Sequence, residues 1–110
     1  MFGEPLPSVS PSDVPAGAFL LDVRELDEWE AGHAPDAVHV PMGEIPARIA
    51  EVPEDGDVVV ICRVGGRSAR VVAYLQGNGR GNVFNLDGGM QAWDATGKPV
   101  VSASGPGIVI

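Results

Sequence analysis

Short apolar runs alternate with polar stretches of helical periodicity along most of this chain. The runs that we expect to be strands are 19–23, 37–40, 58–61 and 83–86. The segments that we expect to be helical lie at about 25–30, 44–51, 66–76 and 88–93. Apolar strands separated by helices are typical of a parallel sheet that is buried on both faces. The pattern therefore predicts an α/β fold with a central parallel β-sheet flanked by α-helices on both faces.

Length and composition narrow the class of protein. We expect the 110 residues to form one domain, which would bury about 65% of its unfolded surface. A net charge of −8 disfavours nucleic acid and anionic membranes as partners. No run is apolar for the roughly 20 residues that a membrane helix needs, and the first residues lack the features of a signal peptide. These features predict a cytoplasmic protein.

Cys62 is the only cysteine, and it lies where the apolar run 58–61 gives way to a glycine-containing turn and a helix. A single cysteine excludes an internal disulfide and any cysteine-rich zinc site. A helix N-terminus carries unpaired N–H groups and the positive end of the macrodipole, so a sulfur held there is favoured as the nucleophilic thiolate. Carboxyl ends of parallel strands are also where active sites lie in such sheets. We therefore interpret Cys62 as a candidate nucleophile.

Basic residues gather beside this cysteine. Arg63, Arg67 and Arg70 follow it closely, while no Asp or Glu occurs from residue 58 to residue 86. Arginines beside a thiol would lower its pKa and would attract an anionic substrate. The structural alternative is that Cys62 is a small core residue that ends a strand, because free cysteine is among the most buried residue types.

Other polar and aromatic residues have simpler interpretations. We expect structural roles for His33 and His39, which lack partners at metal-ligand spacing, so no metal site is predicted. Trp29 and Trp93 are interpreted as core aromatics. The acidic run 25–30 is expected to be a solvated helix face, with docking of a basic partner as the alternative.

Four segments carry a resemblance to a known family. Cys62-Arg63-Val64-Gly65-Gly66-Arg67-Ser68 closely resembles the active-site loop of single-domain rhodanese-like sulfurtransferases. Segments 21–25, 32–37 with Pro41, and 86–93 followed by 97–100 match the same family in the same order. The resemblance covers about residues 8–101 and leaves short extensions at both ends. Asp36 stands where the family usually has glycine, and we expect it to adopt left-handed backbone angles there.

The resemblance implies a rhodanese-type enzyme without a cofactor. Its thiolate, Cys62, would take the sulfane sulfur of a donor such as thiosulfate, become a persulfide, and pass that sulfur to a thiophilic acceptor such as cyanide or a thiol. The partners would be small molecules, with an acceptor protein as a further possibility. Backbone N–H groups from Arg63 to Ser68, including Val64, Gly65 and Gly66, would stabilise the persulfide. Arg63 and Arg67 would attract the donor's sulfonate, and Ser68 would cap the helix or bind the sulfur.

In the family, the aspartate at Asp22 helps to hold the active-site loop and the neighbouring Arg24. The simpler alternative for these two residues is a structural ion pair or a turn.

Two alternative functions remain at this point. The chain would be a rhodanese module that relays sulfur to a partner or only binds one, or a cysteine phosphatase or arsenate reductase. The intact Cys62 and its arginines disfavour a purely binding module. Cysteine phosphatases place an arginine six residues after the cysteine, whereas Arg67 is five residues after Cys62. The shorter loop favours sulfur transfer over phosphate chemistry.

Overall fold

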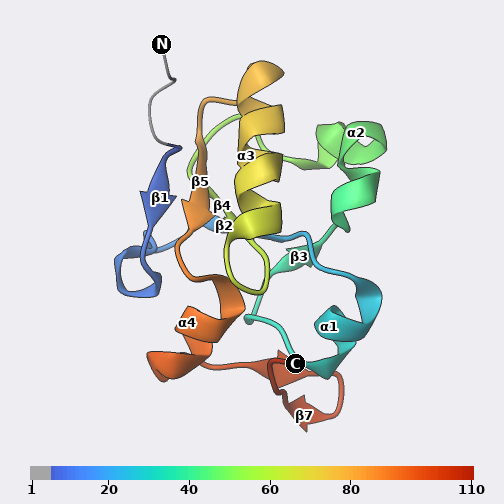
Figure 1. Cartoon of the computed structure of the whole chain (residues 1–110), viewed down its shortest axis with the longest axis vertical. Helices are drawn as coiled ribbons and strands as arrows, with labels where there is room; N and C mark the ends of the chain where they lie inside the picture. The colour runs from blue at the N-terminus through green and yellow to red at the C-terminus, as the bar shows by residue number, and fades with distance from the viewer. Residues whose placement is uncertain (1–5) are drawn as a thin grey trace.

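The computed structural model describes residues 6–110, and its centre is a sheet of five short strands (Figure 1). The strands are β1 (Ser8–Val9), β2 (Phe19–Asp22), β3 (Val38–His39), β4 (Val58–Ile61) and β5 (Val83–Leu86). Their order in the sheet is β1-β5-β4-β2-β3, and every neighbouring pair is parallel. The predicted parallel sheet is therefore confirmed, with β4 at its centre.

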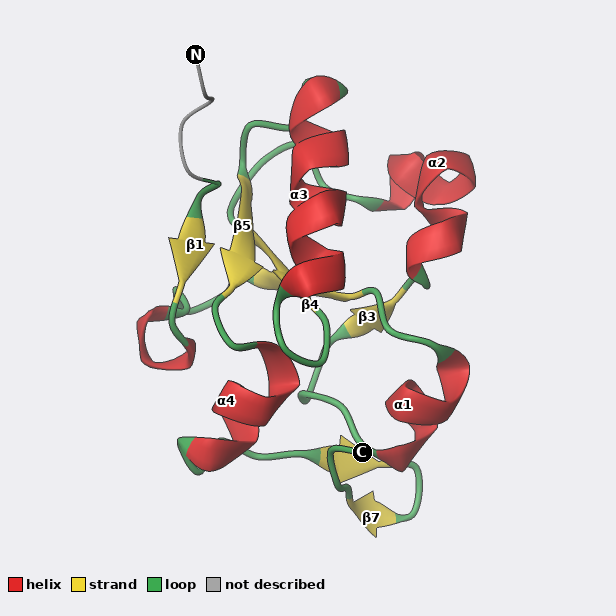
Figure 2. Cartoon of the chain, in the orientation of Figure 1, coloured by secondary structure: helices red, strands yellow, loops and turns green. Residues whose placement is uncertain are grey.

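Helices cover both faces of this sheet (Figure 2). They are α1 (Leu26–Ala31), α2 (Ile45–Arg48), α3 (Gly66–Gly77) and α4 (Gly89–Ala95). Val72 and Leu75 of α3 pack with Ile45 of α2 in the core cluster on one face. Met90 and Trp93 of α4 belong to the cluster on the other face. Because both faces are covered, all four residues of β4 are fully buried, as its continuous apolar sequence requires.

The register of the strands places the polar residues that follow them at one edge. Asp22 at the end of β2 lies beside Ile61 on one side and His39 on the other. Cys62 follows Ile61 directly, so it emerges next to Asp22 at the carboxyl edge of the sheet. This edge faces the lower part of Figure 1, where α1 and α4 also lie.

Two elements differ from the sequence-based prediction. The helix expected at 44–51 is broken into a 3₁₀ turn at Met42–Glu44, the short α2, and a second 3₁₀ turn at Ile49–Glu51. Pro46 explains where α2 begins, because it has no N–H to donate to the carbonyl of Met42 and is tolerated only in the first turn of a helix. The strand β1 was not predicted, since two residues are too few to show a periodicity.

The last residues form a segment that packs back onto the domain. Strands β6 (Val101–Ser102) and β7 (Gly105–Pro106) make a small antiparallel hairpin. Beyond it, the N–H of Ile108 donates to the carbonyl of Ala31 at 2.9 Å. Gly32 permits this approach, because a Cβ there would overlap the backbone of Ile108. The tail thus covers the end of α1.

The structure also bears on the expected conformation of Asp36 and on the length of the helices. Asp36 has a φ of 64°, which confirms the left-handed conformation expected where the family has glycine. Within residues 6–110, no helix has both the length and the apolar composition needed to cross a bilayer.

Candidate active site

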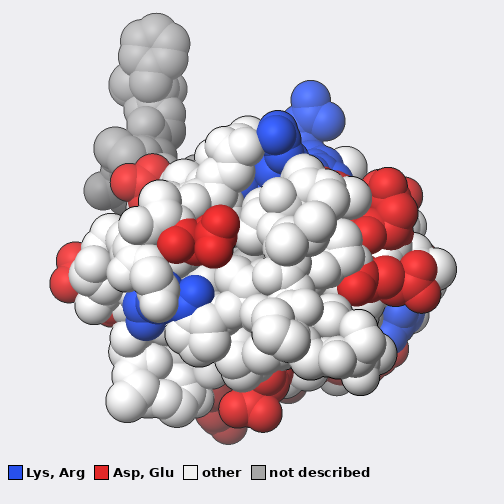
Figure 3. Space-filling model, turned by 90° about the horizontal axis from the view of Figure 1, so that it is seen from below, with Lys and Arg blue, Asp and Glu red and all other residues white. Residues whose placement is uncertain are grey.

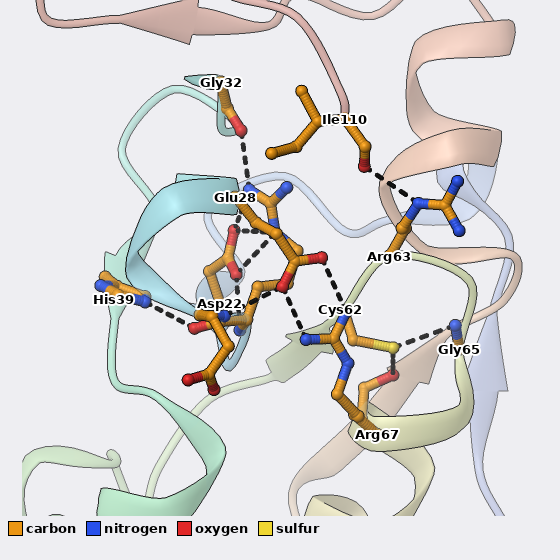
Figure 4. Close-up of polar contacts among 12 residues, drawn as sticks. Asp22, Glu28, Gly32, His39, Cys62, Arg63, Gly65, Arg67 and Ile110 are labelled. Atoms are coloured by element: carbon orange, nitrogen blue, oxygen red, sulfur yellow. Dashed lines mark hydrogen bonds and ion pairs between the residues drawn. The ribbon is translucent and has the colours of Figure 1, made fainter. Parts of the chain in front are cut away.

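Cys62 lies at the floor of a tight loop between β4 and α3 (Figure 4). Its Sγ accepts hydrogen bonds from the backbone N–H of Gly65 at 3.0 Å and from the hydroxyl of Ser68 at 3.2 Å. The residue is only 1% exposed. The sulfur is therefore buried and in contact with hydrogen-bond donors of the loop.

These donors favour the thiolate. Burial by itself raises the pKa of Cys62, but the hydroxyl of Ser68 and the N–H groups of Ser68, Gly65 and Val64 stabilise the negative sulfur and outweigh burial. The net result is a pKa below the ordinary value of a cysteine. Stabilisation of the anion comes from hydrogen bonds inside the loop, and the neighbouring arginines are not among its main causes.

The loop keeps its shape through a partner on β5 that the sequence analysis missed. Asn85 donates from Nδ2 to the carbonyl of Gly65 at 3.2 Å, and its Oδ1 lies within hydrogen-bond distance of the Ser68 hydroxyl, whose single hydrogen is shared between Asn85 and the sulfur of Cys62. Gly65 itself has a φ of 111°, which a residue with a side chain rarely adopts. A signal for Asn85 was present, because it is the one polar residue within the apolar run Val83–Leu86.

The N-terminus of α4 supports the same loop from below. The N–H of Met90 donates to the carbonyl of Cys62 at 2.8 Å, and the N–H of Gln91 donates to that of Arg63 at 3.0 Å. Gly89 makes this contact possible, since a Cβ at that position would lie 2.5 Å from the carbonyl oxygen of Cys62. Two helix N-termini, those of α3 and α4, therefore meet at the cysteine loop.

The two arginines of the loop both have partners. Arg67 forms a bidentate ion pair with Glu28 of α1, with N–O distances of 2.7 and 2.8 Å. Arg63 donates from Nε to the carbonyl of Ile110 in the tail, at 2.9 Å. The expectation that the acidic run 25–30 is only a solvated face is wrong for Glu28, whose side chain is 13% exposed. Val64, between the arginines, is 53% exposed, and Gly66 begins α3.

Asp22 and Arg24 form a fully buried ion pair next to the loop. The guanidinium donates to both carboxylate oxygens, with the shortest contact at 2.8 Å from Nη2 to Oδ2. Nη2 also donates to the carbonyl of Gly32 at 2.7 Å. The pair ties the end of β2 to the end of α1, which is the element that carries Glu28.

The two histidines stack on one tryptophan. Trp29 lies between His33 and His39, with ring centroids 3.6 and 4.9 Å away and nearly parallel planes. One nitrogen of each imidazole also lies against a backbone carbonyl. Within residues 6–110, no three His, Cys, Asp or Glu side chains are grouped so as to hold a metal ion. Trp93 is 5% exposed, and its Nε1–H donates to the carbonyl of Pro99.

The surface of the molecule at the carboxyl edge of the sheet carries few charged groups in its middle. Figure 3 shows this face, toward which the strand arrows of Figure 1 point, with a broad uncharged area and with acidic groups mostly toward its margins. The exposed apolar side chains Leu26 and Val64 belong to α1 and to the cysteine loop. Val64 therefore gives the cysteine loop an exposed apolar side chain two residues after Cys62.

Comparison with known proteins gives consistent results. The family model described as a rhodanese-like domain matches residues 11–96. A protein named sulfurtransferase from Allochromatium vinosum is 46% identical over 86 residues, which is 78% of this chain and 80% of that protein. The thiosulfate sulfurtransferase GlpE of Pseudomonas savastanoi pv. phaseolicola is 40% identical over 80 residues, or 73% of this chain and 76% of that protein.

A solved structure agrees in fold. The crystal structure of a rhodanese-related protein from Thermoplasma volcanium superposes with a TM-score of 0.81 at 32% identity, covering 86% of this chain and 97% of that one.

Proposed function

Because the chain belongs to the rhodanese-like domain family, we propose that it is a sulfurtransferase that carries a sulfane sulfur on Cys62, from a donor such as thiosulfate to an acceptor such as cyanide or a thiol. The observation that supports this most directly is the loop of donors around Sγ, with contacts of 3.0 and 3.2 Å. A thiolate held in this way is a nucleophile, and the same donors suit the negative sulfur of a persulfide.

The reaction balances without a cofactor. The Cys62 thiolate attacks the outer sulfur of thiosulfate, a bond forms between Sγ and that sulfur, and the S–S bond of the donor breaks as sulfite leaves with the electron pair. The acceptor then attacks the outer sulfur of the persulfide, and Cys62 leaves as the thiolate. Both steps are substitutions at sulfur, so no external oxidant or reductant is needed.

The loop residues have separate roles in this proposal. The N–H groups of Val64, Gly65 and Ser68 stabilise the charged sulfur, and Gly65 supplies the backbone conformation that aims them inward. Arg63 is the first candidate to attract a sulfonate, because among the described residues it pairs with no Asp or Glu and only its Nε is used, in the contact with the main-chain oxygen of Ile110. Asp22 and Arg24 act as supports behind the loop.

The size of the loop supports sulfur transfer over phosphate hydrolysis. Arg67 is only five residues after Cys62, with four residues between them, and Cys62 is almost fully buried. A phosphate needs a wider cradle around its oxygens, whereas a persulfide adds a single atom. We expect no hydrolysis of p-nitrophenyl phosphate above background, and hydrolysis that depends on Cys62 would contradict this argument.

The decisive experiment follows the sulfur. Purified protein incubated with thiosulfate should gain the mass of one sulfur atom, and cyanide or dithiothreitol should remove it. Cys62→Ser should gain nothing under the same conditions. Sulfur uptake that persists in this variant would refute the assignment of Cys62.

The partners follow from the same chemistry. We propose a small-molecule donor, an acceptor that is a small thiol or a thiol-bearing protein, and a reducing compartment such as the cytoplasm, where a lone thiol remains available.

A further inference from the structure

The surroundings of Cys62 are less positively charged than the sequence of its loop alone implies. The sequence around the cysteine has three arginines and no acidic residue, but the fold brings Glu28 from α1 into contact with Arg67. Both carboxylate oxygens are used, at 2.7 and 2.8 Å, so the pair carries no net charge. The hydrogen bonds to Glu28 are the main reason that the pKa of Arg67 is raised, and the charge of Cys62 adds a smaller contribution.

Glu28 is held in place by more than this ion pair. It is the third residue of α1, and its Oε1 also accepts the backbone N–H of Glu25 at 3.0 Å, which completes a capping box at the start of the helix. The hydrogen bonds from Arg67 and Glu25, with the nearby charge of Arg24, lower the pKa of Glu28 in spite of its burial. The carboxylate is therefore ionised at neutral pH and fixed at one position.

Resting on the proposed function, we propose that Glu28 is a specificity-determining residue that cancels the charge of Arg67 and so selects sulfane donors of low negative charge over the dianion thiosulfate. Its carboxylate repels a second negative charge above Cys62 while Arg67 remains in place to shape the loop. The exposed side chains of Leu26 and Val64, 57% and 53% exposed, agree with a donor that carries an apolar group. Sulfur transfer itself is unchanged, since the Sγ–S bond forms and the donor's S–S bond breaks in either case.

Two sulfur donors with the same reacting bond and different charges can test this proposal. Thiosulfate and the methanethiosulfonate anion both hold their sulfane sulfur on a sulfonyl sulfur, but they carry two and one negative charges. Glu28→Gln keeps the shape of the side chain and exposes the charge of Arg67. We expect the ratio of kcat/KM for thiosulfate to that for methanethiosulfonate to rise by about fivefold, mainly through the KM of thiosulfate.

The matched control is Glu51→Gln. Glu51 pairs with Arg48 on the exposed surface after α2, and its loss should leave the donor ratio unchanged. Because Arg63 attracts thiosulfate in both proteins, the test is the difference between them: raising the salt concentration from about 20 to about 200 mM should reduce thiosulfate turnover more steeply in Glu28→Gln than in the wild type. An equal salt dependence in the two proteins would mean that Glu28 does not cancel the charge of Arg67. A steep salt dependence in Arg63→Ala, which keeps the pair of Glu28 and Arg67, would mean the same and does not require Glu28→Gln to fold.

Alkylation of Cys62 tests the inference independently of sulfur transfer. Iodoacetate is negative and iodoacetamide is neutral, and both react with the thiolate. The ratio of their rates should rise about fivefold in Glu28→Gln. An unchanged or lower ratio would overturn the role given to Glu28, even if sulfur transfer is established. Absence of sulfur uptake from both donors would overturn the proposed function alone, and the alkylation ratio would still decide the role of Glu28.

Discussion

Replacing Asp22 with Asn removes the carboxylate to which the buried guanidinium of Arg24 is hydrogen-bonded. Both side chains are 0% exposed, and the carboxylate accepts from Nε, from Nη2 and from the backbone N–H of Arg24. The variant keeps the shape of the side chain and leaves a cation buried without its counter-charge. Breaking a buried pair in this way costs about 3–5 kcal/mol, a large part of the roughly 5–15 kcal/mol that stabilises a domain.

Urea denaturation measures this loss. With a slope of about 2 kcal/mol/M for a domain of this size, the midpoint should fall by about 2 M. The control is Glu51→Gln, which breaks the exposed pair with Arg48 and should cost at most about 1 kcal/mol. The double variant Asp22→Leu with Arg24→Met removes both charges and should be more stable than Asp22→Asn. A cost for Asp22→Asn no larger than that of Glu51→Gln would refute the reasoning, because it would mean that water or another group solvates Arg24.

Three further predictions concern the cysteine loop. Ser68→Ala should raise the pKa of Cys62, because the thiolate loses a hydrogen bond, and the pH profile of alkylation by iodoacetamide should move to higher pH; an unmoved profile would contradict this. Since the folded-state pKa of Cys62 is lowered, the thiolate stabilises the fold above the unfolded value of about 8.5 and this contribution is lost as pH falls through the folded value. The difference in unfolding free energy between the wild type and Cys62→Ala should therefore grow as pH rises toward about 9, and a constant difference would count against a stabilised thiolate. Gly89→Ala should abolish sulfur uptake, because the new Cβ would displace the backbone at Cys62. Gly97→Ala is the control: Gly97 also has a positive φ but lies in open space, so the variant should lose only about 1–2 kcal/mol of unfolding free energy and keep its activity. Equal activity in the two variants would show that the loop tolerates the shift.

The strands and the position of Cys62 could be predicted from local sequence patterns. Each apolar run produced a strand within one or two residues of its expected bounds, because burial on both faces requires continuous apolar sequence. The helix at 66–76 was also found, since Val71, Val72 and Leu75 mark one face and Gly77 lies at its end. The geometry of Cys62 follows from the turn between these two elements, which is why a strand, a glycine turn and a helix in sequence were sufficient.

Contacts between segments that are distant in the sequence could not be predicted from it. Glu28 and Arg67 lie on different helices, and nothing in the run 25–30 distinguishes Glu28 from its exposed acidic neighbours. Ile110 reaches Arg63 only because the tail folds back over Gly32. Charge near the thiol is thus set by tertiary packing, whereas the hydrogen bonds to its sulfur are set by the local turn.

The position of β1 in the sheet has a consequence for how the protein folds. β1 pairs with β5, so that Ser8 lies opposite Asn85, and this contact joins segments from opposite ends of the chain. Closing so long a loop is costly in entropy before any contact is made, while β4 and α3 are neighbours in sequence and associate early. We expect the cysteine turn to form in the folding transition state and β1 to dock last. Asn85, which contacts the turn at Gly65, also pairs with Val60 of β4, so the thiol would gain this support when β5 joins β4, before β1 docks.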